Sequence, residues 1–119
     1  MNQREFLYLC VEGDPNKLEK AIANGASVNR KAKYHGVSVA PLFVATMEMN
    51  LEAMKVLTSH NAKHFPGFMA AMLLEDEVLF TYLVENCHAD VNCMDRHKRT
   101  PLMCAIVANR AEIVEWLGR

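Results

Sequence analysis

Residues 100–105 read Thr-Pro-Leu-Met-Cys-Ala, and residues 40–45 read Ala-Pro-Leu-Phe-Val-Ala. A second pair of segments also matches: residues 25–29 read Gly-Ala-Ser-Val-Asn, and residues 88–92 read His-Ala-Asp-Val-Asn. Recurring segments of this kind are the signature of a repeat protein, in which one short unit stacks on the next. The two matches therefore predict a chain made of copies of a single unit.

Outward from these segments, the sequence predicts four pairs of short helices. Asp14 and Thr100 suit N-caps, each is followed by a proline suited to the first turn of a helix, and Gly25 suits a left-handed C-terminus. Helices this short cannot bury an apolar face alone, so the pairs must stack along a continuous core. The expected pairs are Arg4–Glu12 with Pro15–Ala23, Pro41–Glu48 with Leu51–Ser59, Gly67–Leu74 with Glu77–Asn86, and Pro101–Ala108 with Ala111–Leu117.

The unit resembles the ankyrin repeat, whose pattern runs Asp-x-x-Gly-x-Thr-Pro-Leu-His-x-Ala, then an outer helix with a Leu pair, then Gly-Ala-Asp-Val-Asn. The last unit matches at Asp95, Thr100, Pro101, Leu102, Ala105, Glu112, Ile113, Val114 and Leu117, with Asn109 in place of an inter-helix glycine and Trp116 at a core position. The resemblance covers nearly the whole chain. It implies an all-α ankyrin-repeat α-solenoid of about four helix pairs, forming one domain over residues 1–119 with units near 1–34, 35–64, 65–94 and 95–119.

The spacing of the units is uneven. Equivalent inner-helix positions at Leu9, Ala45, Ala71 and Ala105 are 36, 26 and 34 residues apart, against about 33 in the family. The first finger, the hairpin expected at residues 30–40, should therefore be enlarged. The second connection is too short for a finger, so we expect a tight turn after Ala62, with Phe65 and Phe68 packed inward. Phe43 and Met103 replace the histidine of the family pattern.

Composition limits the function classes. The chain is 51% apolar with a net charge of −1, so it should fold, and nothing in its overall charge favours nucleic acid or an anionic membrane. It contains neither a signal-peptide pattern nor a long apolar run. We therefore expect a cytoplasmic protein, or one delivered into a host cell if it is an effector.

Motifs for catalysis and cofactor binding are missing from the sequence. It contains no phosphate-binding glycine loop and no nucleophile elbow, so we expect no enzyme activity and no cofactor. Cys87, His88, Cys93 and His97 lie within eleven residues, but their spacing matches no zinc-finger pattern. We expect four free thiols, no bound metal, and solvated side chains at His60 and His64.

Two features point to a partner-binding surface on the inner helices and fingers, where repeat proteins usually meet their partners. One is an apolar stripe made of the residue two positions after each equivalent inner-helix position. Leu74 lies next to the stripe in sequence and broadens it. Its members are Val11, Met47, Leu73 and Val107. The alternative is that a tilt between units buries part of this stripe in the core.

The other feature is basic. The first finger carries Arg30, Lys31, Lys33 and Tyr34, and the last finger, residues 93–99, carries Arg96, His97 and Arg99. The alternative is that these are merely solvated loops. The sequence thus predicts a protein–protein interaction module whose partner has apolar anchors and acidic flanks, with a targeting or scaffold fragment of a larger enzyme or secreted effector as the second hypothesis.

Overall fold

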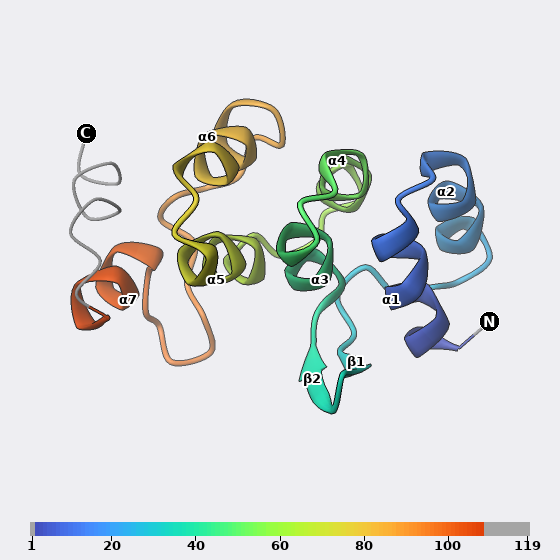
Figure 1. The fold of residues 1–119 in the computed structure, drawn as a ribbon, viewed down its shortest axis with the longest axis horizontal. Helices are drawn as coiled ribbons and strands as arrows, with labels where there is room; N and C mark the ends of the chain where they lie inside the picture. Colours follow the sequence, from blue (N-terminus) through green and yellow to red (C-terminus); the bar gives the residue numbers. More distant parts are fainter. Residues whose placement is uncertain (1, 109–119) are drawn as a thin grey trace.

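The computed structural model describes residues 2–108, which form seven helices and one two-stranded antiparallel hairpin (Figure 1). In chain order the elements are α1 (Gln3–Glu12), α2 (Pro15–Ala23), β1 (Ala32–Tyr34), β2 (Val37–Val39), α3 (Pro41–Met47), α4 (Leu51–Ser59), α5 (Phe65–Leu74), α6 (Glu77–Glu85) and α7 (Pro101–Val107). The helix predicted at Ala111–Leu117, with Asn109 and Trp116, lies outside the described residues.

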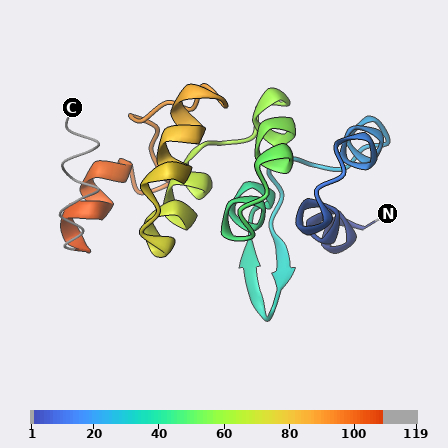
Figure 2. The ribbon, with the colours of Figure 1, turned by 45° about the horizontal axis from the view of Figure 1, so that its top comes forward.

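The helices stack in two layers. The inner layer contains α1, α3, α5 and α7, each packed on the next, and α2, α4 and α6 form the outer layer (Figures 1 and 2). Each outer helix packs against the inner helix that precedes it. The stack confirms the predicted all-α repeat solenoid.

Local side chains set the helix ends as the sequence predicts. The Asp14 carboxylate accepts hydrogen bonds from the backbone N–H groups of Asn16 and Lys17, and the Thr100 hydroxyl accepts one from the N–H of Met103. Gly25 has a φ of 102°. These contacts satisfy N–H groups that have no partner inside their own helix.

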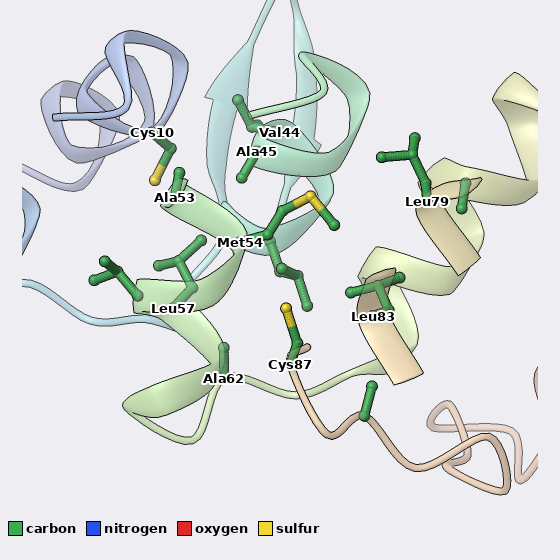
Figure 3. Close-up of a cluster of buried hydrophobic side chains, with 14 of the residues drawn as sticks. Cys10, Val44, Ala45, Ala53, Met54, Leu57, Ala62, Leu79, Leu83 and Cys87 are labelled. Carbon is green, nitrogen blue, oxygen red and sulfur yellow. The ribbon is translucent and has the colours of Figure 1, made fainter. Parts of the chain in front are cut away.

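One apolar core runs between the layers. Figure 3 shows Met54 of α4, Leu83 of α6 and Cys87 in one cluster of buried side chains. Deeper in the α5–α6 pair, the Phe68 and Phe80 rings stack with centroids 5.5 Å apart. Both rings are almost completely buried, so this pair is a main stabilising contact of the third unit.

The connection between α4 and α5 is the irregular part of the stack. Only residues 60–64 separate the two helices, which confirms the predicted tight turn. Helix α5 begins at Phe65, two residues before the predicted Gly67, because Pro66 is tolerated in a first helical turn. Phe68 is buried as predicted, but Phe65 is only half-buried, since no second finger lies over it.

Candidate functional site

The first finger is a regular β-hairpin. Ala32 pairs with Val39 and Tyr34 with Val37, and the two-residue turn His35-Gly36 has φ values of 50° and 81°. Positive φ at both turn positions matches the right-handed twist of the paired strands. The enlarged connection thus forms a finger that projects away from the inner helices (Figure 2).

The base of this finger is fixed to α1. The buried Gln3 side chain donates from Nε2 to the backbone oxygens of Ser27 at 2.6 Å and Arg30 at 2.9 Å. Tyr34 Oη donates to Glu48 at 2.9 Å, and its ring lies 5.8 Å from that of Tyr8. Burial and the Glu48 carboxylate raise the pKa of Tyr34. The orientation of the finger is therefore set by the body of the protein.

Asp95 organises the last finger. Its Oδ1 accepts from the backbone N–H groups of His97 at 2.8 Å and Arg99 at 2.9 Å, and its Oδ2 accepts from Arg99 Nε at 2.9 Å. Hydrogen bonding from the backbone N–H of Arg99 is the main cause that lowers the pKa of Asp95. Arg99 thus already has a carboxylate partner, whereas Arg96 Nε donates to Nε2 of the His97 ring at 3.3 Å.

His64 connects the tight turn to the next unit. Its Nδ1 accepts from the backbone N–H of Asp90 at 2.9 Å, so the prediction of a solvated side chain is wrong for this residue. The adjacent Lys63 N–H donates to the Asn29 side chain at 2.8 Å. His60 is exposed and lies 2.9 Å from Glu19. The turn is therefore held to the finger bases on both sides of it.

A groove occupies the position of the missing second finger. It has a volume of about 990 Å³ and lies between the first finger and the last finger, which contribute Lys31 and Arg96 to its walls. The turn after α4 and the first turns of α3 and α5 complete its lining. We call it the finger groove.

The lining of the finger groove has an apolar part, which we call its floor, and a charged part, which we call its rim. Its apolar lining includes Phe43, Phe65, Pro66, Met69 and Met94. Its charged lining consists of Lys31, Lys63, Arg96, Arg99, Asp90 and Asp95, with His64 and His97 beside them. With both histidines neutral, the net charge of this lining is +2, although the whole chain carries −1.

The residues of the predicted apolar stripe differ in their solvent exposure. Val11 and Leu74 are half-buried against the core, and Met47 is half-buried. Leu73 is 60% exposed and Val107 is 85% exposed. Side-chain burial therefore differs along the stripe.

Pairs of apolar side chains nevertheless recur on three adjacent inner helices. Residues four apart lie on the same face of a helix, which groups Phe43 with Met47 on α3, Met69 with Leu73 on α5, and Met103 with Val107 on α7. We call these six residues the apolar ridge. Phe43 and Met69 also line the finger groove, so the groove and the ridge are continuous.

The structure thus brings part of the predicted site together. The finger groove collects Lys31, Arg96, His97 and Arg99 from two fingers, whereas Arg30, Lys33 and Tyr34 lie outside it. Sequence reasoning missed Lys63, Phe65 and Met69 as site residues. The short connection between α4 and α5 could have pointed to these residues, because a missing finger leaves the residues around it exposed.

The four cysteines are free thiols, and burial raises the pKa of each of them. Among residues 2–108, no group of three or more His, Cys, Asp or Glu side chains is placed to hold a metal ion. No helix in the same part of the chain is long and apolar enough to cross a membrane.

Comparison with known families gives one match. A family model of ankyrin repeats, in three copies, matches residues 42–118. A search of curated proteins finds no matching sequence. The matched span begins in α3 and includes the tight turn, the last finger and most of the finger groove.

Proposed function

Because the chain belongs to the ankyrin-repeat family, whose repeats are generally protein–protein interaction modules, we propose that it binds a partner protein or peptide through its inner helices and fingers. Ankyrin-repeat domains are also typically non-catalytic. Fold alone does not specify a partner, so the exposed side chains are what distinguish the binding face.

The apolar ridge carries this proposal. Leu73 is 60% exposed and Met103 is 50% exposed, and both lie on the inner layer beside half-buried apolar neighbours. Exposed apolar side chains that gather on one face are typical of interaction sites. Fully burying one such side chain against a partner contributes about 1.5–3 kcal/mol.

Charge substitution on the ridge tests the proposal. Partners are first identified by pull-down from the native source with mass spectrometry, and their affinity is then measured for Leu73→Asp. We expect a loss of about tenfold to a hundredfold, because a carboxylate at a desolvated contact also leaves the apolar pocket of the partner unfilled.

Val78→Asp is the matched control. Val78 is 73% exposed on the outer helix α6, so the chemical change is similar but lies on the other layer. The control should bind the partner like the unchanged protein. Equal losses in the two variants, or no loss in Leu73→Asp with its fold intact, would remove the ridge from the binding site.

A further inference from the structure

We propose that the finger groove binds an extended acidic peptide, with one large apolar side chain of the peptide on the groove floor. This inference rests on the proposed function, because it names the partner chemistry for one part of the same face. The groove exists because the connection between α4 and α5 is too short to form the second finger that a regular stack has at this place.

The groove has the room and the apolar lining for a large anchor side chain. Its volume of about 990 Å³ lies at the upper end of the 300–1,000 Å³ that is usual for ligand sites. Phe65 and Met69 are one turn apart on α5, and both are half-buried rather than sealed in the core. Met69 and Met94 are flexible and polarizable, so they adapt to an inserted ring or branched chain.

The charge of the rim favours acidic residues on both sides of that anchor. Within residues 2–108, no carboxylate lies at ion-pair distance from Lys31, Lys63 or Arg96. These three cations come from the first finger, the tight turn and the last finger, so they surround the floor.

The two carboxylates of the groove are already engaged in hydrogen bonds. Asp95 is paired with Arg99, and Asp90 Oδ1 accepts from the backbone N–H of Asn92 at 2.9 Å. The Asp95–Arg99 pair balances its own charges, and Lys31, Lys63 and Arg96 outnumber the one remaining carboxylate, Asp90, so the lining keeps a net positive charge.

The same observations argue against nucleic acid. Nucleic-acid affinity depends on several phosphate contacts along a basic surface. Among the lining residues of the groove, only Lys31, Lys63 and Arg96 are cations without an ion-pair partner in the described part of the chain, and they lie beside an apolar floor. A peptide supplies both the carboxylates and the apolar side chain that this lining complements.

Selection from a phage library of random dodecapeptides tests the inference on the whole chain. We expect enriched peptides with one Phe, Trp, Leu or Met flanked by Asp or Glu. Fluorescence anisotropy of the labelled peptides should show a loss of about tenfold to a hundredfold for the double variant Lys63→Glu/Arg96→Glu, and weaker binding as salt rises. The matched control Lys55→Glu, an exposed lysine on α4, should bind within about twofold.

Methyl NMR of 13C-labelled methionines gives a readout that does not depend on variants. The peptide should shift the methyl signals of Met69 and Met94, and it should leave the fully buried Met54 unchanged. Failure to enrich peptides, enrichment of neutral or basic peptides, or shifts confined to other methionines would overturn the inference.

Failure of this inference differs from failure of the proposed function. Leu73 lies outside the groove lining, so Leu73→Asp tests the ridge through the native partner, whereas the selected peptides test the groove. If the peptides fail but Leu73→Asp still weakens the native partner, the groove is wrong and the ridge stands. If acidic peptides are enriched and Leu73→Asp does not change the affinity for the native partner, the groove is supported and the ridge is not part of the binding site.

Discussion

Asn50 joins the first two units, and changing it to Asp tests that link. Its Oδ1 caps α4 by accepting from the N–H of Ala53 at 3.2 Å, while its Nδ2 donates to the backbone oxygen of Val11 at 3.1 Å. Gly13 leaves room for this contact, because a Cβ there would lie 1.7 Å from Asn50 Nδ2. Asn50→Asp keeps the capping oxygen but removes the donor.

The expected cost follows from the two roles. Asp is as good an N-cap as Asn, so the cap itself should change little. The part-buried Val11 oxygen then loses its donor and faces a carboxylate, which should lower the free energy of unfolding by about 1–3 kcal/mol. For a chain of this size, each 1 kcal/mol corresponds to roughly 4 °C in melting temperature.

Urea unfolding followed by circular dichroism measures this cost, and Asn2→Asp is the control. Asn2 caps α1 by accepting from the N–H of Glu5 at 2.9 Å, and its side chain makes no bond to another unit within residues 2–108. The control should change stability by less than about 0.5 kcal/mol. If both variants are equally stable, the bond to Val11 contributes nothing and the reasoning fails.

Three further predictions concern the core and the thiols. Phe68→Ala should cost about 3–5 kcal/mol in urea unfolding, whereas Phe65→Ala at the half-buried groove floor should cost less than about 1.5 kcal/mol; similar costs would contradict the assigned burial. Burial raises the pKa of Cys10 from 9.0 to about 12. The stabilisation from its protonated thiol is therefore complete below pH 9 and is lost as the pH rises toward 12, so Cys10→Ala should fall less steeply in stability over this range. Finally, a zinc chelator should leave the melting temperature unchanged, and a chelator-sensitive melt with stoichiometric zinc would reverse the metal-free prediction.

The sequence by itself determined the repeat architecture. Matching segments at 40–45 and 100–105 placed two inner helices, and Asp14 and Thr100 placed helix starts, because capping is a local interaction that needs only neighbouring residues. The loss of residues between equivalent positions likewise predicted a tight turn, since chain length alone limits what a connection can form. These features depend on local residue propensities and on the number of residues between equivalent positions.

Only the tertiary structure decided which of the expected surface residues share a site. Val11 is half-buried and Leu73 is exposed. This difference depends on tertiary contacts with neighbouring units, which no local sequence pattern encodes. Arg99 and Arg96 have the same charge in the same finger, yet Asp95 pairs with Arg99 because the turn brings those two side chains together. Burial is set by residues distant in sequence, so it emerges only once the units are stacked, whereas the Asp95–Arg99 pair depends on the geometry of one turn.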